Sequence, residues 1–198
     1  MKILFAIIII LCLVIAGIYC NTLFRGRMII WRKVLEWLDI PSDAKVAVLG
    51  LDYAGLFIDV AKELKAPGEV TGVNVGDSRV LEQEKERIKE NKVADRAKLV
   101  DGDLLNLPLE NREFDYVLSS FTFHRASPAI NKGRAIQEAV RIMKPNGTLV
   151  IVDFGNVQEY RQILTNLGFN SIHISSTGFN GWWGGPWLPT NILVARRN

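Results

Sequence analysis

Polar residues that could bind a ligand or move a proton follow successive apolar segments of this 198-residue chain. In chain order they are Gly50 and Asp52 after residues 46–49, Asn74 within 70–75, Asp103 after 97–100, and His124 after 114–120. Short β-branched apolar runs of this kind indicate buried strands. If the strands are parallel, their carboxyl ends share one edge of the sheet, where open α/β sheets bind ligands. The spacing therefore predicts one site at that edge.

The first turn limits which ligand fits. Gly50 allows a tight turn, but Asp52 and Ala54 stand where dinucleotide-binding turns carry further glycines. A carboxylate at Asp52 would repel a pyrophosphate, which disfavours NAD(P) and nucleoside triphosphates. S-adenosylmethionine carries a sulfonium and an ammonium group and has no phosphate. It can use the same turn without an anion-binding site, so Gly50 and Asp52 are assigned to the cofactor site.

The next polar residues suit an adenosyl ligand. Asn74 ends the second strand, where dinucleotide folds place an acid that accepts from ribose hydroxyls, and its amide oxygen can still accept, with Asp77 nearby. Asp103 can accept a hydrogen bond from the exocyclic amine of adenine. Leu104 and Leu105 are available to cover the ring. We therefore assign Asn74, Asp103 and Leu104 to the cofactor site.

His124 is the candidate catalytic residue, because it follows the fourth strand at the expected rim of the cofactor cleft. It would orient or deprotonate the acceptor, and a hydrogen-bonded structural histidine is the alternative. His173, inside an apolar strand, is expected to be structural. Asp153, at the end of the fifth strand, could line the acceptor pocket or cap the following helix. Asp101 is expected to bond locally in its turn.

Alternating strands and helices predict an α/β fold with a Rossmann-like, doubly wound, mostly parallel sheet. The expected strands are residues 46–49, 70–75, 97–100, 114–120, 148–154, 171–175 and 191–195. The expected helices between them are residues 56–64, 78–91, 130–143 and 157–167. Residues 144–147, Lys-Pro-Asn-Gly, are expected to form a turn. Residues 178–189 are too few for a helical crossover, so the last two strands should form an antiparallel hairpin.

The beginning of the chain is predicted to lie in a membrane. Residues 3–19 are apolar without interruption and, as a helix, would extend roughly 25 Å, close to a hydrocarbon core of about 30 Å. We expect a transmembrane anchor over residues 1–21, an amphipathic juxtamembrane helix over 22–40 and a globular domain over 41–198. A cleaved signal peptide is the competing interpretation.

Basic residues predict the orientation of this anchor. Those on its C-terminal flank are Arg25, Arg27, Arg32 and Lys33, whereas Lys2 and the amino terminus lie on the other side. The positive-inside rule then places the globular domain in the cytoplasm, as a single-pass membrane protein.

The segment 22–39 can form an amphipathic helix. Its expected apolar face carries Phe24, Met28, Trp31, Leu35 and Leu38. Such a helix could lie on the membrane or cover the domain. The sequence leaves both arrangements open.

Composition argues against several classes of site. The net charge is +3, much of it beside the anchor, and nothing resembles a nucleic-acid-binding stripe. Cys12 and Cys20 are the two cysteines, and both lie in or beside the expected span. The globular domain is therefore expected to have neither a disulfide framework nor a metal site. The oligomeric state cannot be inferred.

Four segments carry a resemblance to a known family: VAVLGLDYAG, GEVTGVNVGDS, KLVDGDLLNLPLENREFDYVLSSFTFHR and AIQEAVRIMKPNGTLVIVDF. In this order and spacing they resemble class I S-adenosylmethionine-dependent methyltransferases, especially the small-molecule branch called methyltransferase type 11, which includes quinone-ring methylating enzymes. The resemblance covers about residues 45–154. It implies S-adenosylmethionine as cofactor, a small-molecule acceptor and Ser119 as a further cofactor-binding residue. Together with the anchor it predicts a membrane-anchored methyltransferase acting on a small, lipophilic acceptor.

The sequence also departs from the family pattern. Family members usually have an acid where Val48 and Asn74 stand, and glycines where Asp52 and Ala54 stand. A catalytically inactive domain that serves as a membrane-tethered interaction module is therefore the alternative function. A nucleotide-dependent oxidoreductase is a third hypothesis, which Asp52 and the lack of a Tyr-x-x-x-Lys pair disfavour.

Three tryptophans precede the last strand: Trp182, Trp183 and Trp187. Their rings could form a lid over the acceptor, dock on the bilayer or pack within the hairpin. The sequence does not decide among these roles.

Overall fold

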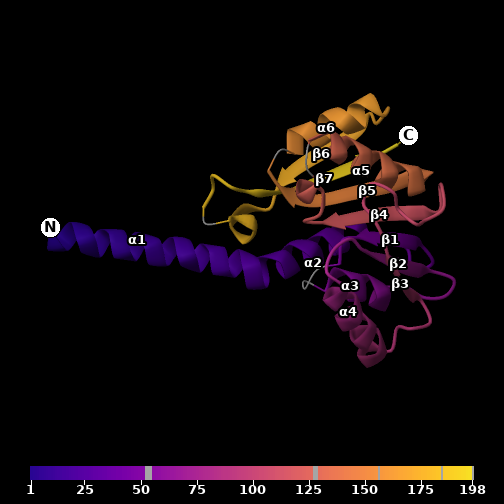
Figure 1. Cartoon of the computed structure of the whole chain (residues 1–198), viewed down its shortest axis with the longest axis horizontal. Coiled ribbons are helices and arrows are strands. Elements are labelled where there is room, and N and C mark those ends of the chain that lie inside the picture. The colour runs from indigo at the N-terminus through magenta and orange to yellow at the C-terminus, as the bar shows by residue number, and fades with distance from the viewer. Residues whose placement is uncertain (52–54, 127–128, 156, 184, 198) are drawn as a thin grey trace.

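The computed structural model describes residues 1–51, 55–126, 129–155, 157–183 and 185–197, and Figure 1 shows the arrangement of the elements. The strands are β1 Lys45–Leu49, β2 Glu69–Asn74, β3 Ala97–Asp101, β4 Phe114–Ser120, β5 Met143–Phe154, β6 Ser171–Ser176 and β7 Thr190–Arg196. The α-helices are α1 Lys2–Asn21, α2 Arg27–Leu38, α3 Leu56–Glu63, α4 Ser78–Asn91, α5 Ala129–Ile142 and α6 Val157–Asn166. Shorter helical segments are η1 Thr22–Gly26, η2 Phe123–Arg125 and η3 Gly178–Gly181.

The strands form one seven-stranded sheet in the order β3-β2-β1-β4-β5-β7-β6. Neighbouring strands from β3 to β5 are parallel, whereas β7 runs antiparallel to both β5 and β6. The Rossmann-like sheet and its C-terminal antiparallel hairpin are thus confirmed. Strand order reverses between β1 and β4, and open α/β sheets bind ligands at such a reversal.

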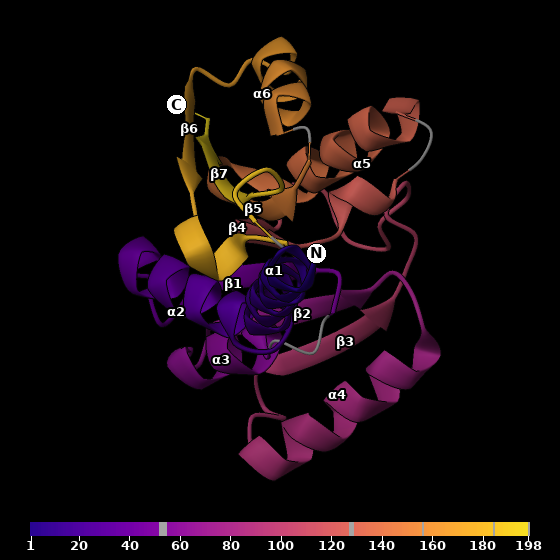
Figure 2. The same ribbon diagram turned by 90° about the vertical axis from the view of Figure 1, so that its left-hand side faces the viewer.

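Helices cover both faces of the sheet (Figure 2). Helices α2, α3 and α4 pack on one face and α5 and α6 on the other, each over its own apolar core. The side chains of β1 alternate between them: Val46 and Val48 belong to the first core, and Ala47 and Leu49 to the second. Burial on both faces explains why this strand is apolar throughout.

The N-terminal segment is one continuous helix of 37 residues, Lys2–Leu38. Its first part, α1, projects away from the domain (Figure 1), and by length and composition it could cross a membrane. A five-residue π-helical segment, η1, joins α1 to α2. Helix α1 is therefore connected to the domain through unbroken helix.

Helix α2 covers the domain. Its buried residues are Ile30, Trp31, Val34, Leu35 and Leu38. The indole N–H of Trp31 donates to Ser120 Oγ at 2.9 Å, which joins α2 to the end of β4. The expected apolar face was partly wrong, because Phe24 and Met28 are exposed. Phe24 lies within the π-helical turn of η1, which changes the helical phase, so a regular 3.6-residue pattern cannot be extended from α2 back to it. Met28 lies in the first turn of α2, ahead of the buried residues of that helix.

The start of β5 also differs from the expectation. The strand begins at Met143, which pairs with Phe114, and regular pairing resumes between Thr148 and Tyr116. Residues 144–147 therefore form an irregularity within the strand, opposite Asp115. The ammonium of Lys144 contacts Asp115 Oδ1 at 2.8 Å and holds the irregular segment against β4.

Candidate active site

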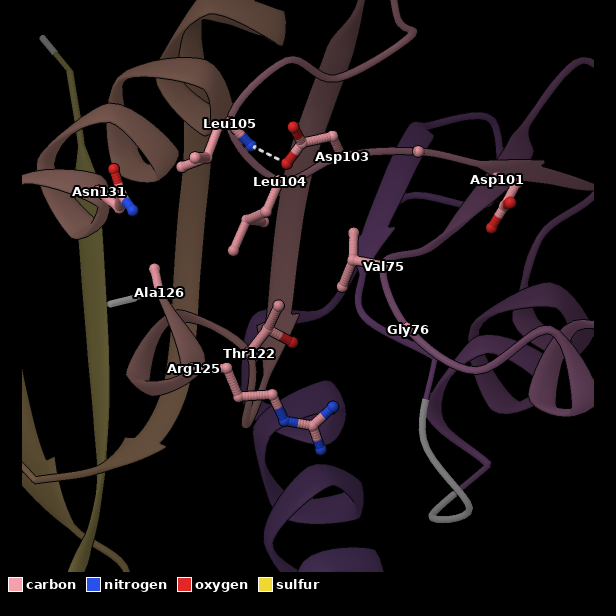
Figure 3. Close-up of a pocket in the computed structure, with 11 residues that line it drawn as sticks. Val75, Gly76, Asp101, Asp103, Leu104, Leu105, Thr122, Arg125, Ala126 and Asn131 are labelled. Carbon is pink, nitrogen blue, oxygen red and sulfur yellow. Dashed lines mark hydrogen bonds between the residues drawn. The ribbon is translucent and has the colours of Figure 1, made fainter. Parts of the chain in front are cut away.

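A pocket of about 480 Å³ opens at the carboxyl ends of β2, β3 and β4 (Figure 3). Its lining consists of Val75, Gly76, Asp101, Gly102, Asp103, Leu104, Leu105, Thr122, Arg125, Ala126 and Asn131. Two carboxylates, apolar side chains and one guanidinium therefore meet in one cavity. A pocket of this size and mixed character is typical of a small-molecule or cofactor site.

Asp101 is held in place by the neighbouring strand. Asn74 and Asp101 are in register at the ends of β2 and β3, and the amide of Asn74 donates to Asp101 Oδ1 at 2.9 Å. Asn74 is buried and, within the part of the chain that the structure describes, does not line the pocket. It therefore contributes by orienting Asp101, whose second carboxylate oxygen is available to a ligand. The sequence pattern had suggested only a local bond for Asp101.

Asp103 and Leu104, which the sequence assigns to the cofactor site, lie in the pocket wall. The backbone N–H of Leu105 donates to Asp103 Oδ1 at 2.9 Å, which fixes the carboxylate in its turn. Leu104 points into the space between Asp103 and Thr122 (Figure 3). The pocket wall thus places a hydrogen-bond acceptor, the Asp103 carboxylate, beside an apolar surface.

The remaining candidate cofactor residues lie elsewhere. Asp52 is outside the residues that the structure describes. Ser119 is fully buried, and its hydroxyl has no hydrogen-bond partner among the described residues. Asp77 caps α4, since its Oδ1 accepts from the backbone N–H of Arg79 at 2.9 Å. Neither Ser119 nor Asp77 is among the described residues that line the pocket.

Gly50 supports the pocket from behind. It has a φ of +79°, and a Cβ at this position would overlap the hydroxyl of Thr122. That hydroxyl lies 3.0 Å from the carbonyl oxygen of Leu49 and 2.7 Å from that of Ser120, so it cannot move aside freely. Thr122 lines the pocket, and the missing side chain of Gly50 lets it sit there.

Replacing Gly50 with alanine should lower the free energy of unfolding by about 2–4 kcal/mol, because the overlap of the new Cβ with Thr122 adds about 1–3 kcal/mol to the cost of the left-handed backbone, about 1 kcal/mol. Gly168→Ala is the matched control, since Gly168 has a φ of +88° but open space where a Cβ would lie. It should cost only about 1 kcal/mol. Denaturant unfolding of the full chain in detergent measures both. Equal losses would contradict the proposed overlap with Thr122.

The loop that forms one pocket wall is fastened to α5 by an ion pair. Arg141 contacts both carboxylate oxygens of Glu138, at 2.9 and 2.8 Å. It also donates to the carbonyls of Leu107 and Leu109 and to the side chain of Asn111. Glu138 in turn accepts from the backbone N–H of Leu107 at 2.9 Å. This network fixes the segment that continues from Leu104 and Leu105.

Lowering the pH should weaken the attachment of this loop to α5. Hydrogen bonding to Arg141, with a smaller contribution from the backbone N–H of Leu107, holds the pKa of Glu138 below its usual range. A carboxylate with a lowered folded-state pKa stabilises the fold above its ordinary pKa, about 4.3, and this contribution disappears as the pH falls through the lower value.

Glu138→Gln should therefore cost about 1.5–3 kcal/mol of unfolding free energy at pH 7 and a smaller amount at pH 3, because the contribution begins to disappear below about 4.3. Glu86→Gln, which removes an exposed ion pair with Lys89 on α4, is the control and should cost little at either pH value. Thermal unfolding at the two pH values provides the measurement. A pH-independent loss for Glu138→Gln would contradict this explanation.

His124 forms a pair with Asp153 beside the pocket. His124 lies in η2, directly after β4, and its Nδ1 is 2.7 Å from Asp153 Oδ1. Its backbone N–H donates to Asp153 Oδ2 at 2.9 Å, and its ring stacks on Phe154 with centroids 4.3 Å apart. The His124 side chain is 24% exposed and that of Asp153 is fully buried. Nδ1 is thus engaged by the carboxylate, which leaves Nε2 for another partner.

Asp153 accepts from two further donors. The backbone N–H of Phe154 donates to Oδ1 at 2.9 Å, and the phenol of Tyr160 donates to Oδ2 at 3.2 Å. Burial, together with the adjacent carboxylate, raises the pKa of Tyr160, so its hydroxyl remains a donor. The two backbone N–H groups and the phenol donate to Asp153, and Nδ1 of His124 can donate as well. A carboxylate in this position fixes the orientation of the imidazole and the nitrogen that carries its proton.

The sequence identified His124 but not its partnership with Asp153. Among the described residues, His124 is not part of the pocket lining, whereas its neighbours Thr122 and Arg125 are. His124 follows β4 and Asp153 lies near the end of β5, and these two strands are adjacent and parallel. Polar residues at the ends of adjacent parallel strands were therefore the signal for this pair.

The chain is similar to known methyltransferases. A family model described as "Methyltransferase domain" matches residues 51–151. Demethylmenaquinone methyltransferase from Lactiplantibacillus plantarum is 32% identical over 134 residues, which cover 67% of this chain and 55% of the relative. The chain thus spans about half the length of the curated relatives that it matches.

Solved structures are similar in fold. A SAM-dependent methyltransferase from Aquifex aeolicus superposes with a TM-score of 0.70 at 17% identity, covering 85% of this chain and 89% of that chain. Phosphoethanolamine N-methyltransferase 2 from Haemonchus contortus, in complex with S-adenosyl-L-methionine, gives a TM-score of 0.67 at 16% identity. That superposition covers 83% of this chain and 51% of the other. At these identities the likeness concerns the fold.

Proposed function

The chain belongs to the methyltransferase domain family of class I S-adenosylmethionine-dependent methyltransferases, and we propose that it methylates a small, lipophilic acceptor at a membrane surface. The observation that carries the proposal is the acidic pocket at the carboxyl edge of the sheet with the His124–Asp153 pair beside it. Cofactor and acceptor would then meet at the edge formed by β1, β4 and β5.

The pocket residues fit S-adenosylmethionine. Asp101 and Asp103 each keep one carboxylate oxygen that can accept from ribose hydroxyls or the adenine amine, and their charge favours a cationic ligand. Leu104 offers apolar surface to the base. Arg125 could pair with the carboxylate of the methionine part. The same acidic lining disfavours a pyrophosphate-containing cofactor.

The chemistry assigned to the chain's own residues is positioning and proton transfer. When bound, S-adenosylmethionine supplies an electrophilic methyl group. His124 would accept the acceptor's proton at Nε2, while Asp153 holds the proton of Nδ1 and orients the ring. Tyr160 keeps the carboxylate in place from its other side. A base is needed because hydroxyl-bearing acceptors become nucleophilic on losing a proton.

The proposed acceptor class rests on the N-terminal helix and on the relatives. A helix long and apolar enough to cross a membrane would keep the domain beside lipid-soluble molecules. The relative from L. plantarum is named for demethylmenaquinone, which supports a lipophilic quinone-type ring as acceptor. Basic residues C-terminal to α1 favour a cytoplasmic domain on a single-pass anchor.

Binding and transfer experiments on the full chain in lipid nanodiscs test the proposal. Titration with S-adenosylmethionine should give saturable binding, whereas NADH should not bind. Labelled donor should then transfer its methyl group to reduced demethylmenaquinone in the same nanodiscs. Absence of S-adenosylmethionine binding would favour the inactive interaction module, and NADH binding alone would favour the oxidoreductase.

A further inference from the structure

The loop between β6 and β7 runs beside the junction of α1 and α2. Figures 1 and 2 show it extending from the sheet toward α1, next to the helix. The hydroxyl of Thr22 donates to the carbonyl of Trp182 at 2.6 Å, and Gly26 packs so closely on the backbone of Asn180 that a Cβ would not fit. The ring of Tyr19 meets Trp183 edge-on, with centroids 5.7 Å apart. The loop is therefore fixed to the end of the apolar span.

Three large apolar side chains of this loop are exposed: Phe179, Trp187 and Leu188, which we call the loop tip. Trp187 is 69% exposed, Phe179 50% and Leu188 39%. Residues 177–189 include no charged side chain. Exposed large apolar side chains in an uncharged segment are typical of surfaces that contact a protein or a membrane.

We propose that the loop tip inserts into the interfacial region of the same bilayer that α1 crosses. The bilayer is identified as the contact of the loop tip by the position of the loop along the N-terminal helix. The 20 residues of α1 extend about 30 Å, the thickness of the hydrocarbon core, so Tyr19 near its end lies at the membrane–water boundary. Trp183 touches Tyr19 and therefore lies at the same depth. This inference rests on the membrane anchor of the proposed function.

The depth of insertion is limited by the backbone. A loop cannot enter hydrocarbon with unpaired peptide groups, whereas tryptophan and phenylalanine side chains are stable at headgroup level. The loop tip thus supplies a second, shallow contact in addition to the span. Two contacts fix the rotation of the domain about α1, which one helix cannot do.

This orientation brings the candidate base to the membrane. The ring of Trp183 packs on Phe154 with centroids 5.4 Å apart, and Phe154 stacks on His124. The same Trp183 ring contacts Phe121 at 5.8 Å. A continuous set of aromatic contacts thus links the boundary-level Tyr19 to His124. A lipophilic acceptor would have only a short distance to travel from the bilayer.

Nitroxide accessibility in nanodiscs tests the loop tip. Cys12 and Cys20 are exposed and can be replaced by serine to give a background for single labels at Trp187→Cys, Leu188→Cys and Trp37→Cys. Trp37 is the matched control, because it is 60% exposed but lies at the far end of α2. Labels at 187 and 188 should collide several-fold more with oxygen, relative to a water-soluble nickel chelate, than the label at 37.

A label on Cys12 in the Cys20→Ser variant separates the proposed membrane anchor from the proposed insertion of the loop tip. If Cys12 reports hydrocarbon and position 187 or 188 gives the same ratio as position 37, the loop proposal is overturned and the anchor stands. If Cys12 is itself accessible to the nickel chelate, the anchor fails and the loop proposal fails with it. Circular dichroism of each labelled variant verifies that the fold is retained.

Discussion

Replacing His124 with asparagine should lower the turnover rate of methyl transfer by about 10²–10⁴-fold, the usual contribution of a positioned general base. Asparagine can place its amide nitrogen near the position of Nδ1 and so keep the hydrogen bond to Asp153, whereas it has no counterpart of Nε2. The rate of methyl transfer to reduced demethylmenaquinone in nanodiscs measures the loss. Binding of S-adenosylmethionine, measured by titration, should change little, because His124 is not part of the described pocket lining.

Three further variants define this role. His173→Asn changes the other histidine, which is exposed on β6, and should leave the rate unchanged. Asp153→Asn replaces one buried carboxylate oxygen with an amide nitrogen, which donates and would face other hydrogen-bond donors. This variant should reduce kcat, while the KM for S-adenosylmethionine stays within a few-fold. A loss confined to KM, or equal losses for His124→Asn and His173→Asn, would refute His124 as the base. His124→Ala, which also loses the contact with Asp153, should be at least as impaired as His124→Asn.

Replacing Asp103 or Asp101 with alanine should weaken S-adenosylmethionine binding by about 10–100-fold. Each variant would lose a charge-assisted hydrogen bond to the cofactor, worth about 1.5–3 kcal/mol. Asp95→Ala is the matched control, since Asp95 lies before the opposite end of β3 and is 64% exposed in its contact with Arg96. Isothermal titration of the full chain measures all three. Unchanged affinity in both pocket variants would show that the cofactor does not bind in this pocket.

Asn74 should act through Asp101. Its amide donates to Asp101 and its side chain is buried, so Asn74→Ala should weaken cofactor binding only while the Asp101 carboxylate is present. A double-mutant cycle tests this: the effect of Asn74→Ala should vanish in an Asp101→Ala background. Additive losses would instead indicate that Asn74 contacts the ligand directly.

Much of the fold could be predicted because local signals agreed with the tertiary structure. Helix α4, Ser78–Asn91, and strand β4, Phe114–Ser120, have the expected bounds. The final hairpin could be predicted from the few residues between its strands. The signals failed where backbone geometry was irregular. The π-helical turn of η1 put Phe24 out of phase with the apolar face of α2, and pairing of Met143 with Phe114 placed the turn residues 144–147 within β5.

The site was predicted less completely, because side-chain pairing across strands is not a property of one segment. Asp103 and Leu104 were found because they directly follow a strand. The partner of Asn74 is across the β2–β3 pair, and that of His124 is at the end of the neighbouring strand β5. Both partnerships depend on register, which the pattern of one strand does not specify.

The unbroken helix from Lys2 to Leu38 has a kinetic consequence. A catalytic unit on a flexible tether could sample a wide volume of solvent, whereas one fastened to its anchor by continuous helix stays within a thin layer above the lipid. If α1 spans the bilayer as proposed, the domain would encounter a lipophilic acceptor by two-dimensional lateral diffusion. Turnover should then depend on the mole fraction of acceptor in the lipid phase and not on its amount per litre of suspension.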